Sequence, residues 1–208
     1  MKAQFLKLVL MFVIFSNAQT DSLKTNKIQG ETRNILWVLP SKTEQINGIA
    51  LSGWSVNWDW KGSFDETKLK VNGLNLEGNP LGFMFLMYLP ESHFMKLKTL
   101  KEENTNYNSN GLSLSFFGNI SVSEQNGASL GGIWSVSKKT NGITLAGLIT
   151  QNYTVNGLSI APINVNNSTN GIQIGVFNKS TKLKGFQFGI WNQNQCGNFP
   201  LMNFCFKS

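Results

Sequence analysis

The chain has 208 residues, of which 20 are glycine and only 14% are charged, and its formal net charge is +7. This length allows one domain with a real core, and the composition favours short strands and turns over helices. The lysines are scattered at turns and form no basic stripe interleaved with aromatic residues, which argues against a nucleic-acid partner.

Residues 1–18 have the pattern of an export signal. Lys2 and Lys7 precede the apolar run 8–15, and the small residues Ser16-Asn17-Ala18 offer a cleavage site before Gln19. The run is far shorter than the roughly 20 apolar residues that cross a bilayer as a helix. We therefore predict a cleaved signal peptide and an exported protein at the cell surface or outer membrane, with a periplasmic or secreted location as the alternative.

The remaining chain divides into three parts. Residues 19–44 form an irregular segment, in which Ile35–Leu39 could be a first strand. Residues 45–195 form a β-repeat domain with an apolar insert at 79–108, and residues 196–208 form a C-terminal cap. Within the insert, residues 81–89 are wholly apolar; they are predicted to be a buried strand or a cap over one end of the core, and the alternative is a surface that contacts lipid or a partner.

The repeat is a short sequence motif, which reads in order Asn, Gly, hydrophobic, polar, hydrophobic. It begins irregularly at Asn47-Gly48 and Asn72-Gly73, and is clearest over Thr169–Asn194. The alternation of apolar with polar residues predicts strands. Six copies then follow in near-constant register, with their glycines at Gly111, Gly127, Gly142, Gly157, Gly171 and Gly185.

A repeat of this length predicts an all-β, parallel β-solenoid of about 14–16 residues per coil, in which equivalent residues stack about 4.8 Å apart. The six glycines would form one column at a bend. Asn164, Asn178 and Asn192, each seven residues after a column glycine, would form a second column that hydrogen-bonds along its length. The alternative is an antiparallel outer-membrane β-barrel with one strand and one turn per repeat, since about 9–11 residues suffice for a membrane strand.

The alternation also defines two faces. Ile172 and Ile174 lie on one face and Gly171, Gln173 and Gly175 on the other. If Ile172 and Ile174 face a packed interior, their replacement by Ala should cost roughly 2–5 kcal/mol. The serine and threonine residues two positions after the column glycines are a poor match for an ice-binding face, because serine provides no flat array of methyl groups; they are Ser113, Ser129, Thr144 and Ser159.

The phrases NGIQIGVFN and KGFQFGIWNQN resemble the repeats of a bacterial surface-repeat family, found in exported spirochaete and other Gram-negative surface proteins. Residues 74–82 and 199–204 look similar to phrases of the same proteins. The resemblance covers residues 45–206 and implies export and exposure at or beyond the outer membrane. It supplies no catalytic residues, and the two cysteines are atypical of it.

The residues needed for catalysis are scarce. His93 is the sole histidine, and Glu124 is the only acidic residue within the six regular repeats, so no catalytic triad or carboxylate pair is predicted. No phosphate-binding glycine loop is present. Cys196 and Cys205 have no nearby histidine and would make a poor metal site, but in an exported chain they could form a disulfide. We predict no catalytic residue, no cofactor and no metal.

These features together predict an exported non-enzymatic surface-repeat protein with a structural or partner-contact role at the cell envelope. Its partner is unknown, and a cell-envelope component or surface ligand with outer-membrane association fits best. The first alternative is an integral outer-membrane β-barrel protein. The second is a carbohydrate-binding surface module that uses the tryptophans near the acidic residues after the first repeat, namely Trp54, Trp58 and Trp60.

Overall fold

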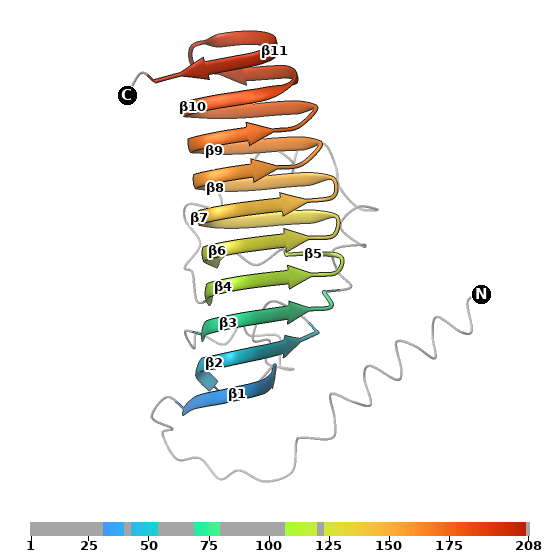
Figure 1. The fold of residues 1–208 in the computed structure, drawn as a ribbon, viewed down its shortest axis with the longest axis vertical. Coiled ribbons are helices and arrows are strands. Elements are labelled where there is room, and N and C mark those ends of the chain that lie inside the picture. Colours follow the sequence, from blue (N-terminus) through green and yellow to red (C-terminus); the bar gives the residue numbers. More distant parts are fainter. Residues whose placement is uncertain (1–30, 40–42, 54–68, 80–106, 120–122, 207–208) are drawn as a thin grey trace, which may run out of the picture.

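The computed structural model describes residues 31–39, 43–53, 69–79, 107–119 and 123–206, and its described part is built from strands and turns without a helix (Figure 1). The eleven strands are β1 (Glu31–Leu39), β2 (Thr43–Ser52), β3 (Leu69–Glu77), β4 (Tyr107–Ser115), β5 (Gly118–Asn119), β6 (Ser123–Gly131), β7 (Trp134–Ala146), β8 (Ile149–Ile160), β9 (Ile163–Ile174), β10 (Phe177–Asn194) and β11 (Gly197–Cys205).

The strands stack in chain order as a β-solenoid, which confirms the first of the two predicted architectures. The hydrogen-bonded order is β1-β2-β3-β4-β6-β7-β8-β9-β10-β11, with the short β5 paired to β7. Among the described strands every pairing is parallel except that of β10 with β11. The antiparallel alternative is therefore wrong.

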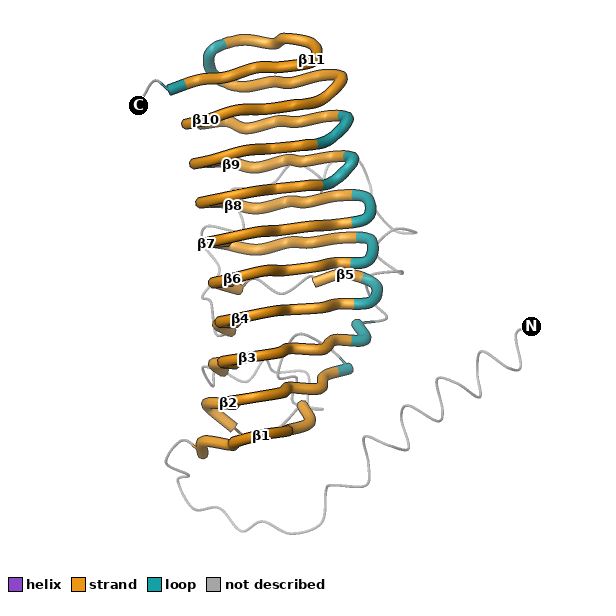
Figure 2. The backbone as a smooth tube through the Cα atoms, viewed as in Figure 1, coloured by secondary structure: helices purple, strands orange, loops and turns teal. Residues whose placement is uncertain are grey.

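Each regular coil consists of a front arm and a back arm joined by bends (Figure 2). In β7 the hydroxyls of Ser137 and Thr140 are 2.8 Å apart across one bend, and those of Ser135 and Thr144 are 3.0 Å apart between the arms. The second bend separates consecutive strands, as at Gly147 and Leu148 between β7 and β8. In Figure 1 the front arms run almost parallel to one another, so this side of the solenoid has little twist.

The interior changes along the solenoid. At the N-terminal end it is apolar, and Ile46, Ala50 and Val71 are fully buried in a cluster with Leu39, Leu69 and Tyr107. In the regular coils it is largely polar, and Asn164, Gln173 and Gln187 are also fully buried. A second apolar cluster of Trp134, Val136 and Ile149, packed with Tyr153 and Ile163, belongs to the other arm of the coils. These side chains point outward from that arm, because they alternate with the inward Ser135 and Thr150.

The C-terminal end of the stack is closed by a chain reversal. After β10 the chain turns back, and β11 pairs antiparallel with the second half of β10, from Gly185 opposite Cys205 to Asn194 opposite Gly197. A disulfide joins Cys196, at the turn, to Cys205, at the end of β11. The reversal provides the last coil with a covering strand, which stacked repeats need at their ends.

Candidate functional site

The most extensive surface feature among the described residues is an apolar face on the front arms. It consists of two columns of outward side chains, each in ladder register from β1 to β11. One column contains Leu36, Ile49, Leu74, Leu112, Ala128, Ile143, Leu158, Ile172, Phe186 and Phe204. The other contains Val38, Leu51, Leu76, Leu114, Leu130, Leu145, Ile160, Ile174, Phe188 and Met202. We call these twenty side chains the apolar face.

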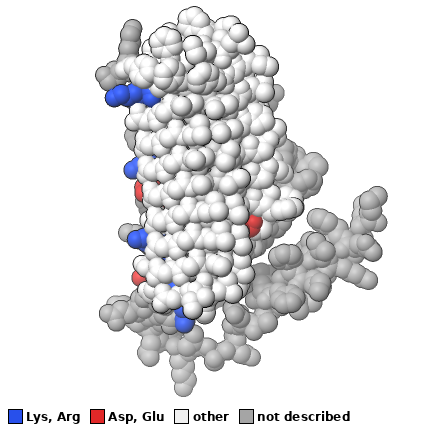
Figure 3. Space-filling model, in the orientation of Figure 1, with Lys and Arg blue, Asp and Glu red and all other residues white. Residues whose placement is uncertain are grey.

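None of these side chains is buried, and Ile172, Ile174 and Phe188 leave 37%, 41% and 39% of their surface exposed. All twenty are apolar, so the centre of this side carries no charge. Figure 3 shows the same: Lys, Arg, Asp and Glu lie at the margins of the front surface, which is otherwise uncharged. Because isolated exposed apolar residues are normal on a protein but a contiguous patch of this extent is not, the apolar face is the leading candidate for an interaction surface.

The apolar residues face outward because most of the polar column between them finds hydrogen-bond partners inside the solenoid; among the described residues the Ser129 hydroxyl and the Asn75 side-chain carbonyl oxygen are exceptions. Gln187 Nε2 donates to Gln173 Oε1 over 2.6 Å, and Asn194 Nδ2 donates to Gln187 Oε1 over 2.8 Å. In the preceding coils Thr150 and Ser159 place their hydroxyls 2.9 Å apart. A buried polar group is costly only when it lacks a partner, so these pairs make a polar interior compatible with a stable fold.

The asparagine column strengthens the same interior. Asn164 Nδ2 donates to Asn178 Oδ1, and Asn178 Nδ2 donates to Asn192 Oδ1, each over 2.8 Å. Asn178 Nδ2 also donates to the carbonyl of Phe188 at 2.9 Å. All three asparagines are fully buried. Their amides therefore connect three successive coils at the bend next to the apolar face.

The glycine column lies at the opposite margin of the face, and it extends from Gly48 and Gly73 through the six glycines of the regular repeats. At Gly157 φ is +137°, and a Cβ there would overlap the carbonyl oxygen of Gly142. Asparagines just before these glycines form a second, partly exposed ladder, in which Asn141 Nδ2 donates to Asn126 Oδ1 over 2.7 Å. Within the stack this position thus favours glycine for both conformational and steric reasons, whereas Ile35, at the same ladder position in the first strand, adopts a φ of +82°.

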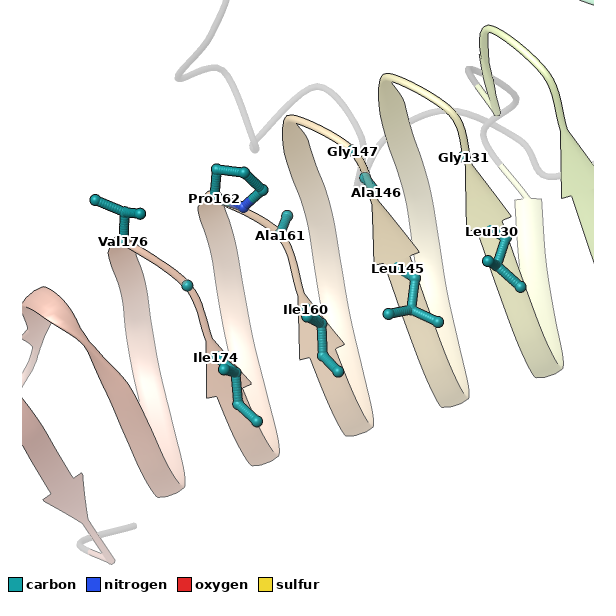
Figure 4. A pocket seen from close by; sticks show the side chains of 11 residues that line it. Leu130, Gly131, Leu145, Ala146, Gly147, Ile160, Ala161, Pro162, Ile174 and Val176 are labelled. Carbon is teal, nitrogen blue, oxygen red and sulfur yellow. The ribbon is translucent and has the colours of Figure 1, made fainter.

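A shallow apolar groove runs beside the second column of the face (Figure 4). Its volume is about 430 Å³. Its walls are side chains of the face and the small residues of the neighbouring bend, listed together as Leu130, Gly131, Leu145, Ala146, Gly147, Ile160, Ala161, Pro162, Ile174, Gly175 and Val176. No side chain in this lining can act as an acid, a base, a nucleophile or a metal ligand. The groove widens the apolar surface and adds no chemistry of its own.

The face becomes aromatic at its C-terminal end. The ring centroids of Phe186 and Phe188 are 6.2 Å apart, and those of Phe186 and Phe204 are 6.3 Å apart. Phe206 adds an edge-on contact to Phe186 at 5.3 Å. These four residues leave between 38% and 56% of their surface exposed, so they form a packed but partly exposed aromatic end of the apolar face.

One buried titratable cluster lies inside the early coils. Asn75 Nδ2 donates to Glu77 Oε1 and to the Tyr107 hydroxyl, and all three side chains are buried. Burial, and secondarily the Glu77 carboxylate, raise the pKa of Tyr107 well above its usual value. The cluster lies between strands and away from the groove. We read it as part of the interior hydrogen-bonding and not as a reactive site.

The residues that the sequence singled out fall into two groups. The structure brings together the glycine column, the asparagine column and the cysteine pair, all within the stack. Trp54, Trp58 and Trp60 lie outside the described residues, as do His93, the apolar run 81–89 and the predicted signal.

Within the described residues no three His, Cys, Asp or Glu side chains are placed to hold a metal ion. No helix in that part of the chain is long and apolar enough to cross a membrane.

The apolar face itself was not identified from the sequence as a surface. Its signal was present, because every repeat places apolar residues one and three positions after the column glycine. The same alternation is equally typical of side chains that fill an interior. Comparison of the chain with protein-family models, with curated proteins and with solved structures found no match.

Proposed function

We propose that this chain is an exported, non-enzymatic surface-repeat protein that uses its apolar face as a contact surface at the cell envelope. One observation carries the proposal: two unbroken apolar columns, partly exposed and free of charge, cross ten strands of one stack. A solenoid held by ladders along its whole length holds such a face in one conformation. Binding through this face costs little conformational entropy, because the side chains of a packed ladder are already restrained.

The proposed location outside the cytoplasm rests on the sequence. The signal pattern of residues 1–18 and the resemblance of the repeats to the bacterial surface-repeat family support export, and the disulfide between Cys196 and Cys205 fits an oxidising compartment. The non-enzymatic character is supported by the chemistry of the groove, whose lining offers no acid, base or nucleophile.

Two matched variants test the role of the face. The face variant replaces three residues of one column by threonine, which retains strand propensity but removes apolar surface: Ile143→Thr, Leu158→Thr and Ile172→Thr. The bend variant makes three changes of the same kind at exposed apolar positions outside the two columns: Phe116→Thr, Leu148→Thr and Ile190→Thr.

The measurement is fractionation of bacteria that produce each variant, with a carbonate wash of the envelope fraction. We expect wild type and the bend variant to be retained on the envelope, and the face variant to be released or secreted. Wild-type protein that stays in the cytoplasm would contradict export. Equal retention of the face variant, with unchanged circular dichroism, would contradict a contact role for the face.

A further inference from the structure

We propose that the apolar face binds the same face of a second copy of this chain, so that two solenoids pack sheet against sheet. This inference rests on the contact role proposed above and names the partner, so that face-dependent retention on the envelope would be retention of the pair. It concerns all twenty side chains of the apolar face, from Leu36 and Val38 in β1 to Phe204 and Met202 in β11.

The size of the face suits a stable pair. Ten strands about 4.8 Å apart and about four residues wide give a surface roughly 40 Å long and 15 Å wide, or about 600 Å² in projection. The groove beside the second column and the exposed Val176 add apolar area at one margin. A standard interface buries about 800 Å² of accessible surface on each partner, and protruding side chains give more accessible area than projection alone.

The chemistry of the face suits a copy of itself. Because no side chain of the face is charged or polar, pairing two faces strips water from apolar groups only and leaves no buried charge or hydrogen-bonding side chain without a partner. Such a composition is typical of homodimer cores, which are more apolar than ordinary surfaces. Half-exposed side chains such as Ile143 (40%) and Leu130 (41%) would lose most of their remaining contact with water.

The geometry of the face favours a second sheet over a lipid surface. Each column repeats at the strand spacing, and an identical copy offers the same repeat, so the rows of one face can fit between the rows of the other along the whole length. Sheets pack in this way about 10 Å apart, and sheets with little twist are commonly stabilised by such stacking. Among the described residues the margin of the face carries charges of both signs, since Glu124 pairs in register with Lys139. These residues therefore form no uniform basic rim suited to anionic lipid.

An isologous pair places each residue of one copy against the same patch of the other. Substitutions in the middle of the face should therefore act twice in each pair. Ala128 lies at this middle position, between Leu112 and Ile143 in the ladder. Ala128→Arg would place a large charged side chain at the centre of both faces without removing a packed side chain.

The test is sedimentation velocity of the purified protein from about 1 to 100 µM, a range that brackets micromolar dissociation constants, with wild type, the face variant, the bend variant and Ala128→Arg. We expect a concentration-dependent pair for wild type and the bend variant. The face variant and Ala128→Arg should be single copies throughout, with unchanged circular dichroism. If the face variant does not fold, Ala128→Arg alone decides.

Three results would overturn the proposal. The first is a wild-type protein that stays a single copy at the highest concentration. The second is pairing of Ala128→Arg as tight as that of wild type. The third is a single-copy protein that floats with phosphatidylcholine or phosphatidylglycerol vesicles through its face, which would make lipid the occupant. If the protein does not pair but its retention in cells still depends on the face, the contact role stands and only the partner is wrong. If the protein pairs in solution but stays in the cytoplasm, only the proposed export is contradicted.

Discussion

Gln187 donates a hydrogen bond through Nε2 to Oε1 of Gln173 over 2.6 Å, and both side chains are fully buried between the arms of adjacent coils. Phe186 and Ile172, which precede them in the chain, point outward from the same strands. The solenoid thus places amides inside and apolar side chains outside. This arrangement connects the stability of the stack with the character of its surface.

The first prediction concerns the glutamine ladder. Gln187→Leu leaves Gln173 Oε1 and Asn194 Nδ2 without the partners they have in the structure. Since an orphaned buried polar group costs about 1–3 kcal/mol, we expect a loss of about 2–4 kcal/mol in the free energy of unfolding, measured by chemical denaturation. Asn126→Ala, in the exposed outer ladder, should cost less than about 1 kcal/mol. A Gln187→Leu effect no larger than that of Asn126→Ala would contradict a satisfied polar interior.

The second prediction compares two apolar residues on opposite sides of the sheet. Leu183 is fully buried, whereas Ile172 remains 37% exposed. Leu183→Ala should cost about 2–5 kcal/mol because it opens a cavity. Ile172→Ala should cost only about 1 kcal/mol when measured on the single copy at low concentration, because part of its surface is already in water. Equal losses in denaturation experiments would show that Ile172 faces a packed interior.

The third prediction tests the glycine column. Gly157→Ala must adopt φ near +137° and overlap the carbonyl of Gly142. The strained conformation alone costs about 1–3 kcal/mol, and the overlap adds to it, so we expect a large drop in melting temperature. Gly53→Ala is the matched control, because a Cβ there meets nothing within 4 Å. A Gly157→Ala protein that melts like the Gly53→Ala protein would contradict the stacking of this column.

The fourth prediction concerns alkaline pH. Because burial raises the pKa of Tyr107 in the folded protein, the unfolded chain loses this proton first, at a pKa of about 10. The folded state therefore holds more protons above pH 10, and stability falls as pH rises further. Below pH 10 the phenol is neutral in both states and has no effect. Denaturation at several pH values should show a shallower alkaline decline for Tyr107→Phe than for wild type, and an unchanged decline would refute the burial argument.

The fifth prediction concerns the C-terminal closure. The disulfide between Cys196 and Cys205 spans nine positions, and a cross-link of this loop length stabilises by about 2–3 kcal/mol in the chain-entropy model. Cys196→Ser with Cys205→Ser should lower stability by about this amount. Hydrogen exchange should be fastest in β11 of this variant, since β11 pairs only with β10 among the described strands. Uniform exchange across β7 to β11 would show that the reversal does not protect the end.

Much of the architecture could be predicted from the sequence, because repeats of near-constant length dictate stacking in register. The columns of Gly157 and Gly171 and of Asn164 and Asn178 follow directly from the spacing. The sequence did not predict which face of the sheet points to the interior. Period-two alternation defines two faces without saying which is inside, and Ile172 beside Gln173 fits either arrangement. The choice depends on hydrogen bonds between coils, such as Gln187 to Gln173, which exist only once the stack has formed.

The central claim is that the apolar face makes contact in the cell, and photo-crosslinking tests it most directly. A benzophenone amino acid replaces Ile143, in the middle of the face, or Thr181, an exposed polar residue outside the face, in bacteria that export the protein. After irradiation we predict an adduct of twice the chain's mass from the Ile143 position and none from Thr181. No adduct from Ile143, or equal adducts from both positions, would contradict the claim.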